Sequence, residues 1–572
     1  MNYNKKEGYT ASDAMNDALV KAGVSHVFIN TGTDYPPIIE SWAKYEAEGL
    51  PKPEIIISPH ESVAVSAAQG YAMATGRAQG VFVHVDVGTQ NLGGALHNAY
   101  RCRVPVFVLA GLSPYTMEGE LPGSRDSYIQ FIQNPRDQAG IVRGYTKMEC
   151  ELKTGKNVQQ MIYRSLQVAK SDPPGPVYMM ATREALEEEG WDVNADMKDW
   201  APCAPIGLDP DSVDILAEAL AGAKNPLIIT SYLGRNEDAV AELVALSDRL
   251  AIPVAESVGS YMNFPTNHPM SLGGAMHGLL GDADVILALD CDLPWPPMAA
   301  GQVENSRVFY LDMDPIKTDI PLWHIKTERS MKADSCVALR QLNAKLAAMA
   351  SELDSAVIEE RRVRVTKRHD DLRADWDAQA GQGETMTSAF VASCIQEIMD
   401  DDTIFVNETI TDRPIVDRYI RRTKPGTTYS AGGSSLGWFG GAAIGIKLAK
   451  PDKKVVAVAS DGVYIFANPT PVYWMARRYN TPFLTVVFNN QGWNAPKMIT
   501  KVQHPEGVAA KTGKFWASFQ PAAQLDKIAE AAGGALAITV EKPSELRDAL
   551  KKGQEAVDSG ICAVINVMLP PV

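Results

Sequence analysis

The sequence predicts an α/β protein of three domains, each a doubly wound, mostly parallel sheet. Short apolar runs rich in β-branched residues alternate with segments of helical period along the whole chain. Continuous apolar runs are typical of parallel strands covered by helices on both faces, and strands that alternate with helices build βαβ units. The predicted strands lie at residues 26–30, 80–87, 104–111, 225–231, 283–290, 307–314, 454–460 and 483–490.

Breaks in this alternation divide the chain of 572 residues into three blocks. The first domain is expected at residues 1–190, and a polar, proline-containing linker follows it. The second is expected at 205–345, and the strongly charged segment 351–383 is expected to be a solvated connecting helix. The third domain is expected at 384–572. Because the first and third blocks each carry a polar loop directly after a buried strand, we expect related domains that face each other.

The composition excludes some classes of partner. The formal net charge of −15 argues against binding to nucleic acid or to an anionic membrane surface. The N-terminus lacks the apolar core of a signal peptide, and no run approaches the roughly 18 apolar residues of a membrane span. The seven cysteines are scattered and form no CxxC pair. They therefore predict reduced thiols and a cytoplasmic protein, without a metal site built on sulfur.

Two predicted strands of the third domain end in short polar side chains that bear oxygen. Asp461 directly follows the strand VVAVAS, and Asn490 ends the strand FLTVVFNN. Ligands bind at the carboxyl ends of strands in open α/β sheets, and carboxylate and amide oxygens suit Mg²⁺ better than zinc. Gly462 would allow a phosphate to approach the backbone closely. The alternative is a pair of ordinary turns, because Asp-Gly and Asn-Asn are common turn formers.

The sequence Ser-Asp-Gly, followed after 26 residues by Asn-Asn, resembles the GDG…NN signature of thiamine diphosphate enzymes. Ser460 departs from this pattern, which has Gly at that position. The resemblance implies that Asp461, Asn490 and the backbone carbonyl of Gly492 bind Mg²⁺, which anchors the diphosphate. It also implies cofactor contacts along the first turn, at Ser460, Asp461, Gly462 and Val463.

A second segment is similar to the invariant-glutamate segment of the same family. Glu61 follows a predicted strand and begins an Ala-rich helical pattern that ends in YAMATG. The resemblance implies that Glu61 hydrogen-bonds the aminopyrimidine ring and promotes its imino tautomer, which takes the proton from thiazolium C2. The alternative is an acidic residue that interacts with the helix dipole.

Two further segments of the third domain match the family. The Gly-rich stretch 430–449 resembles the segment that bends the cofactor, with Leu436 as the wedge and the backbone of Ser434 and Leu436 holding the pyrimidine. The stretch NETITD matches the loop over the diphosphate, with Asn407 and Thr409 as contacts. The family's layout implies that Glu61 and the diphosphate site come from different subunits. A homodimer is then the minimum active unit, and a homotetramer is the usual assembly.

The substrate side resembles two branches of the family. The stretch 99–111 and the His-Glu pair at 60–61 are similar to acetolactate synthases. The stretch HVDVGTQN resembles the H-x-x-x-G-T-x-N motif of benzoylformate decarboxylases, with His84 at their catalytic histidine and Asn91 at the motif's end. Thr33 falls where those enzymes place a serine that contacts the substrate carboxylate. The pKa of an imidazole suits proton transfer near neutrality, although a lone histidine in a buried strand is more often a core residue.

The match to benzoylformate decarboxylases is incomplete. Residues 290–298 lack their second catalytic histidine and offer Trp295 as a residue that lines the pocket. Gln133 lies near the family's active-site glutamine, but the following Asn-Pro-Arg-Asp disrupts the match. The remaining candidates for a second proton relay are His60, His97 and His277.

Together these features predict an enzyme that depends on thiamine diphosphate and Mg²⁺ and acts on a small carbonyl substrate. The expected reaction is decarboxylation of a 2-oxo acid to an aldehyde, carboligation, or both. The alternatives are an acetolactate synthase-type carboligase, or a lyase or hydrolase acting on a 2-hydroxy ketone, a diketone or an acyl-CoA. A regulatory subunit without activity would be expected to lack Glu61 or Asp461, and both are present. FAD is not expected, because no dinucleotide fingerprint follows the strands of the second domain.

Overall fold

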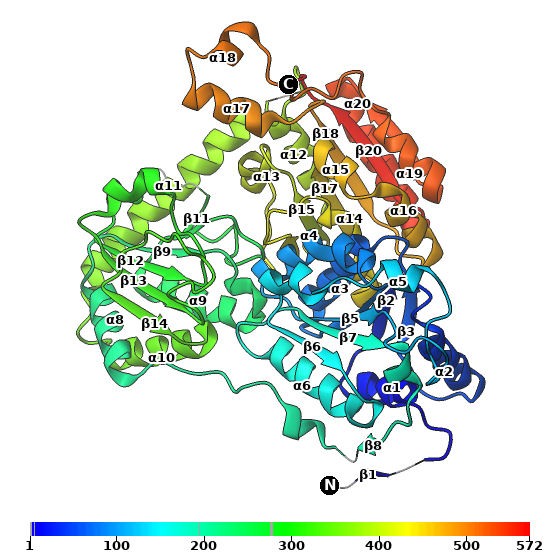
Figure 1. The fold of residues 1–572 in the computed structure, drawn as a ribbon. Coiled ribbons are helices and arrows are strands. Elements are labelled where there is room, and N and C mark those ends of the chain that lie inside the picture. The colour runs from blue at the N-terminus through cyan, green and yellow to red at the C-terminus, as the bar shows by residue number, and fades with distance from the viewer. Residues whose placement is uncertain (1–2, 5, 194, 275–277, 382) are drawn as a thin grey trace.

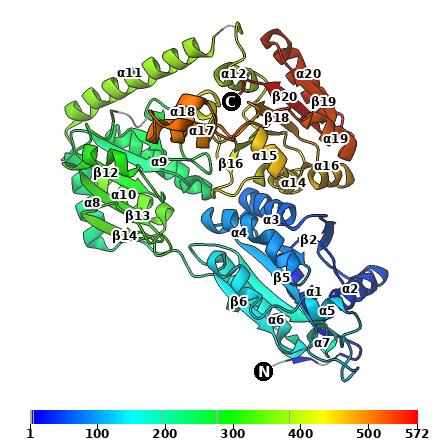
Figure 2. The same ribbon diagram turned by 45° about the horizontal axis from the view of Figure 1, so that its top comes forward.

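The computed structural model describes all residues except 1–2, 5, 194, 275–277 and 382, and contains three six-stranded sheets. Within these sheets the paired strands are parallel, as the continuous apolar runs predict. Figures 1 and 2 show each sheet with helices on its faces. The predicted α/β class with three parallel-sheet units is therefore confirmed. A separate antiparallel pair joins β1 (Tyr3–Asn4) to β8 (Asp192–Val193).

The first sheet has the strand order β3-β2-β4-β5-β7-β6. Its strands are β2 (His26–Ile29), β3 (Glu54–Ile57), β4 (Gln79–Val83), β5 (Val106–Leu112), β6 (Met148–Leu152) and β7 (Val177–Thr182). The helices of this domain are α1 (Ala11–Lys21), α2 (Pro36–Ala47), α3 (Glu61–Thr75), α4 (Val87–Arg101), α5 (Ile129–Ile132), α6 (Val158–Lys170) and α7 (Arg183–Glu187). The strand predicted at 80–87 ends early, at Val83, because the chain turns there and Asp86 has a positive φ of 50°.

The third sheet repeats this arrangement, with the order β16-β15-β17-β18-β20-β19. Its strands are β15 (Ile404–Glu408), β16 (Thr428–Ser430), β17 (Val455–Ser460), β18 (Leu484–Asn489), β19 (Leu536–Val540) and β20 (Ala563–Met568). The helices are α12 (Ser388–Glu397), α13 (Arg413–Tyr419), α14 (Trp438–Ala449), α15 (Asp461–Phe466), α16 (Pro469–Arg478), α17 (Asn494–Gln503), α18 (Val508–Thr512), α19 (Leu525–Gly533) and α20 (Pro543–Asp558). Counted along each domain, both sheets read 2-1-3-4-6-5, which supports a relationship between the two domains.

The central sheet differs, with the order β11-β10-β9-β12-β13-β14. Its strands are β9 (Pro226–Thr230), β10 (Val254–Glu256), β11 (Ser271–Gly273), β12 (Val285–Leu289), β13 (Arg307–Asp312) and β14 (Arg329–Lys332), with helices α8 (Pro210–Gly222), α9 (Glu237–Leu250) and α10 (Ser335–Ala348). Counted along the domain, the order is 3-2-1-4-5-6, that of dinucleotide-binding sheets. The order in which strands are added to the sheet reverses between β9 and β12, and such sheets bind ligands at this point.

The charged connector forms the long helix α11 (Ser355–Ala380), visible at the upper left in Figure 2. One side of it packs on the central domain and buries Arg361, Val365 and His369, whereas the buried Trp376 joins the apolar core of the third domain. The Arg361 guanidinium donates hydrogen bonds to the carbonyls of Leu250, at 2.6 Å, and Ala223. The predicted helix is present, but one side of it is packed against the protein, so it is not a wholly solvated surface helix.

Helices α3 and α14 bring the first and third domains together through small residues. A Cβ added to Gly70 would lie 2.4 Å from the Ala442 carbonyl oxygen, and one added to Gly445 would lie 1.9 Å from that of Ala67. Only glycine permits the two helix backbones to approach this closely. Residues of both helices share one buried core, so the two domains form a continuous apolar interior.

Among the described residues, no helix is both long and apolar enough to cross a membrane.

Candidate active site

The ends of β17 and β18 hold the predicted metal ligands. The Asp461 carboxylate is 2% exposed and accepts hydrogen bonds from the backbone N–H groups of Gly462 at 2.7 Å and Gly492 at 2.9 Å. Asn490 Oδ1 is buried and has no hydrogen-bond partner among the described residues. Leaving such an acceptor unpaired costs about 1–3 kcal/mol, a penalty that a cation would remove. The residues therefore fit Mg²⁺.

The two neighbouring asparagines have different surroundings. Asn489 donates to Asn566 Oδ1 at 2.9 Å and accepts from the Gln491 N–H at 3.1 Å, so its side chain is engaged in holding the turn. Asn490 makes no equivalent contact through its oxygen within the described part of the chain. The geometry thus separates a structural asparagine from a free one. The described residues contain no cluster of three or more His, Cys, Asp or Glu side chains that could hold a metal ion, as expected for a site with a single carboxylate.

The Ser460 side chain connects this turn to the neighbouring loop. Its hydroxyl oxygen accepts a hydrogen bond from the Ile410 N–H at 3.2 Å. In the same segment Asn407 Oδ1 accepts from the Thr409 N–H at 3.0 Å and hydroxyl at 2.7 Å, while Asn407 Nδ2 donates to Asp417 Oδ1 at 2.9 Å. The departure from the family's Gly therefore has a physical role, because Ser460 holds the 407–410 loop against β17.

Glu408 in this loop is a buried carboxyl that the sequence did not single out. Its Oε2 accepts from the Phe439 N–H at 2.7 Å, at the N-terminus of α14. Burial raises the pKa of Glu408 to about 8, although backbone N–H groups of residues 437–439 act in the opposite direction. Glu408 is therefore expected to be largely protonated at neutral pH.

Replacing Glu408 by Gln is expected to remove a pH dependence of stability. Because the folded-state pKa lies above that of an unfolded glutamate, about 4.3, the stabilisation by this group is complete below that value and is lost as pH rises towards about 8. Thermal unfolding of the variant should match the wild type near pH 4 and exceed it near pH 8. The exposed Glu541→Gln variant is the control, and parallel pH profiles of Glu408→Gln and wild type would contradict the assignment.

A second group of predicted cofactor residues begins at Glu61, the first residue of α3. His60 precedes it as the helix cap, and its Nδ1 accepts from the Ser62 N–H at 3.2 Å. Glu61 is 6% exposed, and its Oε2 accepts a hydrogen bond from Asn91 Nδ2 at 3.1 Å. The structure thus joins two residues that the sequence predicts separately, and it engages His60 in capping.

A cavity of about 510 Å³ lies between the first and third domains, and its lining includes neither Glu61 nor Asp461. Asn98 holds one edge, because its amide donates to the Ser435 carbonyl at 2.8 Å and its oxygen accepts from the Ser435 N–H at 3.0 Å. His97 Nε2 lies 3.2 Å from both the nitrogen and the hydroxyl of Ser434, so His97 is committed to this edge. The lining includes Asn91 from the first domain and Leu436, Trp438, Ile465 and Phe466 from the third.

One chain supplies all the residues that line this cavity. Because Glu61 and Asp461 are not among them, the expectation that these two residues come from different subunits stays a prediction. The cavity is lined both by Leu436 and by Asn91, the hydrogen-bond partner of Glu61, and the role of Leu436 as a wedge also stays a prediction.

His84 lies directly after β4 and pairs with a residue that the sequence did not indicate. Its Nδ1 lies 2.6 Å from Asp34 Oδ1, and the two side chains are 18% and 4% exposed. Burial acts to lower the pKa of His84, but the hydrogen bond and charge of Asp34 outweigh it, and Gln133 and Glu61 act in the same direction as Asp34. The pKa of His84 is therefore raised above its ordinary value.

The other predicted substrate residues have mixed outcomes. Thr33 is exposed beside Asp34, and its carbonyl lies 3.5 Å from Arg183 Nη1. The prediction that Trp295 lines the pocket is wrong, because Trp295 is 2% exposed in the core of the central domain. Gln133 is a stronger candidate than its sequence context indicates, because it acts to raise the pKa of His84. Its buried Oε1 lacks a hydrogen-bond partner within the described chain. His277 lies outside the described residues.

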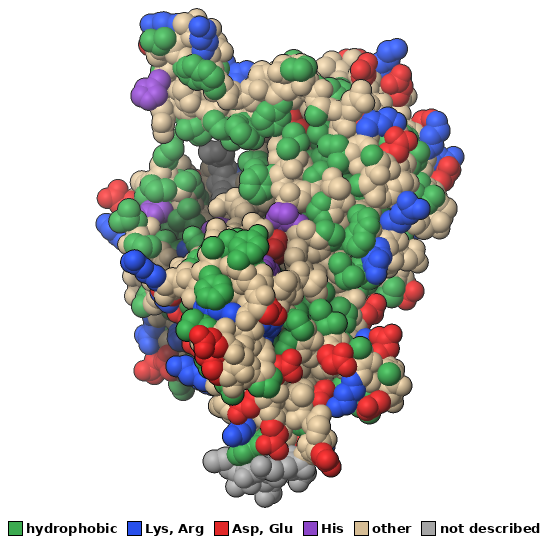
Figure 3. Space-filling model, turned by 45° about the vertical axis from the view of Figure 1, so that its right-hand side comes forward, with side chains coloured by type: hydrophobic (Ala, Val, Ile, Leu, Met, Phe, Trp, Pro, Cys, Tyr) green, Lys and Arg blue, Asp and Glu red, His purple; other side chains and the backbone are tan. Residues whose placement is uncertain are grey.

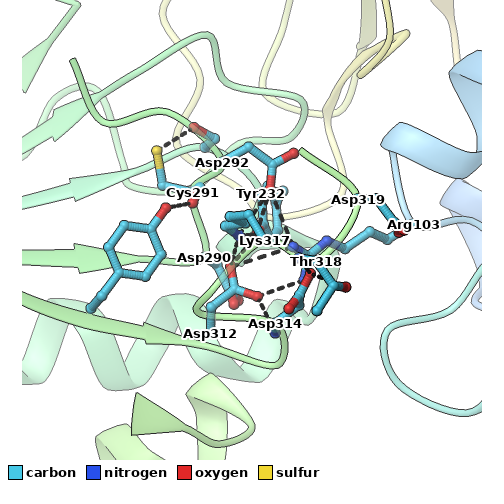
Figure 4. A network of polar contacts seen from close by, with 12 residues as sticks. Arg103, Tyr232, Asp290, Cys291, Asp292, Asp312, Asp314, Lys317, Thr318 and Asp319 are labelled. Carbon is cyan, nitrogen blue, oxygen red and sulfur yellow. Dashed lines mark hydrogen bonds and ion pairs between the residues drawn. The ribbon is translucent and has the colours of Figure 1, made fainter. Parts of the chain in front are cut away.

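A cluster of charged side chains lies at the ligand crevice of the central sheet (Figure 4). Arg103, from the first domain, reaches Asp312 at 2.7 Å and Asp292 at 3.2 Å and covers the Tyr232 ring at 4.4 Å. Lys317 also contacts Asp312, at 2.7 Å. Burial would raise the pKa of Asp312, but the two cations outweigh it and lower the pKa to about 2. The cluster lies at the switch point between β9 and β12 and borders a cavity of about 310 Å³, which Arg103, Asp292 and Lys317 help to line.

Replacing Arg103 by Met is expected to destabilise the junction between the first and central domains. The substitution retains an apolar stem but leaves the fully buried Asp312 with Lys317 as its only cation in this cluster. Removing one partner of a buried ion pair typically costs about 3–5 kcal/mol, and a value near the lower end is expected because Lys317 remains. Calorimetry should show a lower Tm than in Arg101→Met, a neighbouring and more exposed arginine. Equal Tm values would contradict a structural role for the cluster.

Three family models match consecutive parts of the chain. They are described as the N-terminal TPP binding domain, the central domain and the C-terminal TPP binding domain of thiamine pyrophosphate enzymes. The matches cover residues 9–141, 213–320 and 413–567, respectively. Their order agrees with the three sheets.

Individual relatives are similar along most of the chain. A probable acetolactate synthase large subunit of Methanocaldococcus jannaschii is 24% identical over 510 residues, covering 84% of this chain and 80% of the relative. A benzoylformate decarboxylase of Pseudomonas aeruginosa is 24% identical over 517 residues, covering 85% and 87%. The solved benzoylformate decarboxylase of Polynucleobacter necessarius superposes with a TM-score of 0.77 at 21% identity, covering 99% and 100%. The chain belongs to the thiamine pyrophosphate enzyme family.

Proposed function

We propose that this chain uses thiamine diphosphate, anchored by Mg²⁺, to decarboxylate a 2-oxo acid to an aldehyde. The observation that carries the proposal is the hydrogen bond between Asn91 and Glu61, beside a cavity between the first and third domains that Asn91 and Leu436 both line. The buried, unpaired oxygen of Asn490 beside the Asp461 turn supports the metal. Asp461, Asn490 and the Gly492 carbonyl would hold Mg²⁺, and residues 460–463 with Asn407 and Thr409 would border the diphosphate.

When bound, thiamine diphosphate supplies a nucleophilic carbon and an electron sink for the carbonyl carbon of a substrate. Glu61 would hold a proton-bearing ring nitrogen of the pyrimidine, with its carboxylate fixed by Asn91. The backbone of Ser434 and Leu436 would position that ring. Trp438, Ile465 and Phe466 line the cavity and would limit the entry of water. His84 would donate the proton that the product carbon gains, and the exposed Thr33 would contact the substrate carboxylate.

Carboligation is the second candidate, and the similarity to acetolactate synthases supports it. In that reaction a second carbonyl compound, instead of a proton, captures the carbon that has lost CO₂. A lyase or hydrolase reaction on a 2-hydroxy ketone, a diketone or an acyl-CoA would use the same cavity without release of CO₂.

The experiment is a panel of 2-oxo acids, assayed with thiamine diphosphate and Mg²⁺ for CO₂, aldehyde and acyloin. Aldehyde formed in equal amount to CO₂ supports the decarboxylase. An acyloin formed at the expense of the aldehyde supports the carboligase. Neither product from any member, with cleavage of a 2-hydroxy ketone instead, would replace both proposals by the lyase.

A second copy of the chain is the proposed partner, in a homodimer or homotetramer. Figure 3 shows hydrophobic side chains gathered on the projection that α17 and α18 form, beside a hollow. The exposed apolar residues of this region are Trp493, Met498, Ile499, Val502, Val508 and Trp516. Such a surface fits burial against another subunit, which sedimentation equilibrium tests. The seven cysteines are free thiols and support the proposed cytoplasmic location.

A further inference from the structure

The pair formed by His84 and Asp34 has a defined geometry. His84 Nδ1 lies 2.6 Å from one carboxylate oxygen, Asp34 Oδ1. The other oxygen, Oδ2, accepts a hydrogen bond from the Val85 N–H at 3.0 Å. Both oxygens of a carboxylate that is 4% exposed are therefore engaged, so its position is held from two sides. The residues come from the ends of the adjacent strands β2 and β4.

Two glycines leave space for this pair. A Cβ at Gly32 would lie 1.9 Å from His84 Nδ1, and a Cβ at Gly111, in β5, would lie 1.5 Å from Asp34 Oδ2. Any larger residue at either position would displace the imidazole or the carboxylate. Three neighbouring segments of the sheet thus accommodate this one contact, which distinguishes it from a chance surface ion pair.

The contact determines which ring nitrogen is available for chemistry. A carboxylate at Nδ1 favours the form that carries a proton there, and Nε2 is then the nitrogen that exchanges a proton with another group. The groups that act on His84 are Asp34 from the loop after β2, Glu61 from α3 and Gln133 beyond α5. Asp34 makes the direct ionic contact, and it offsets the tendency of burial to keep the ring neutral.

We propose that Asp34 is the positioning residue for His84, holding the imidazole by Nδ1 so that Nε2–H faces the reacting carbon. This inference rests on the proposed function. When the C–C bond to the carboxylate breaks, CO₂ leaves and its bonding electron pair remains with the product carbon. That carbon then gains one proton from Nε2, and a proton from water restores His84. Asp34 stays ionised throughout and contacts neither substrate nor cofactor.

The test is the holoenzyme with Asp34→Asn, which preserves size and an acceptor for Val85. Asp86→Asn is the matched control, because it removes the same charge two residues from His84, and its side chain contacts Gln90. For an active 2-oxo acid, kcat of Asp34→Asn should fall by at least about 10-fold, and its pH profile should move to lower pH. Asp86→Asn should retain the wild-type profile. A merely structural role for Asp34 would lower Tm without moving the profile.

A second readout does not require activity. Diethyl pyrocarbonate modifies neutral imidazole, so mass spectrometry of the His84 peptide reports the pH at which this ring loses its proton. The midpoint should shift downwards in Asp34→Asn and not in Asp86→Asn, with circular dichroism confirming folding. If Asp34→Asn does not fold, the same measurement on Asp34→Ser replaces it. An unchanged midpoint and an unchanged pH profile would overturn the inference. A shifted midpoint in a protein that cleaves no 2-oxo acid would retain the positioning role and reject the proposed function.

Discussion

Asp461→Ala is expected to weaken Mg²⁺-dependent binding of thiamine diphosphate by at least about 100-fold, since residues that only support a metal ligand already contribute 10–100-fold. Asp461 is the only carboxylate among the candidate ligands, and it also holds the Gly492 N–H at 2.9 Å. Its loss would remove the charge that pairs with the metal and loosen the turn that carries the Gly492 carbonyl. Isothermal titration calorimetry, with Mg²⁺ and with a chelator, measures the effect.

The exposed Asp452→Ala variant is the control for this substitution, because it removes the same charge from the loop before β17. It should bind the cofactor as the wild type does. Undiminished binding by Asp461→Ala, or binding that does not depend on Mg²⁺ in the wild type, would reject the metal site.

Glu61→Gln is expected to lower kcat by about 10²–10⁴-fold, the usual contribution of a positioned proton-transfer group. Cofactor binding should change little, because glutamine has the same length and its oxygen still accepts from Asn91 Nδ2. Steady-state kinetics with saturating thiamine diphosphate, beside calorimetric binding, separates the two effects. The exposed Glu48→Gln variant controls for the loss of charge, and activity of Glu61→Gln within a few-fold of wild type would exclude the proposed role.

Mixing the two inactive variants shows whether the site lies within one chain or between two. If different subunits supply Glu61 and Asp461, dimers of one Glu61→Gln and one Asp461→Ala chain contain an intact site, and activity returns. If one chain supplies both, the mixture stays inactive. Subunit exchange must be verified with differently tagged chains.

Much of the fold follows from local sequence. The predicted strands at 225–231, 283–290, 454–460 and 483–490 lie within about one residue of β9, β12, β17 and β18 at most of their ends, since buried parallel strands are continuous apolar runs. The strand at 80–87 extends too far because Val85 and Val87 continue the apolar pattern while the backbone turns at Asp86. Periodicity does not detect such a turn when its residues are apolar. The domain boundaries remain predictions.

The candidate cofactor residues could also be predicted from the sequence, because they follow predicted strands and match short segments that occur in the same order in a known family. What the sequence did not reveal are the partners of those residues. In the sequence, Ser460 is only a departure from the family's pattern, and the structure shows that it accepts a hydrogen bond from the Ile410 N–H. The two asparagines look equivalent in the sequence, and the structure shows that Asn489 is bound to Asn566. Each of these contacts joins separate strand ends, so no local pattern records it.

By itself, the sequence determined the α/β class and the cofactor family, with Asp461 and Asn490 as candidate metal ligands and Glu61 as a candidate catalytic residue, since these depend on periodicity and on residues close in the chain. Only the tertiary structure decided that Asp34 holds His84, 50 residues away, and that Arg103 pairs with Asp312, 209 residues away. Strand order and the loops at strand ends create these pairs. A buried charge is stable only beside its partner, so the environment of each ionisable group is a property of the folded chain.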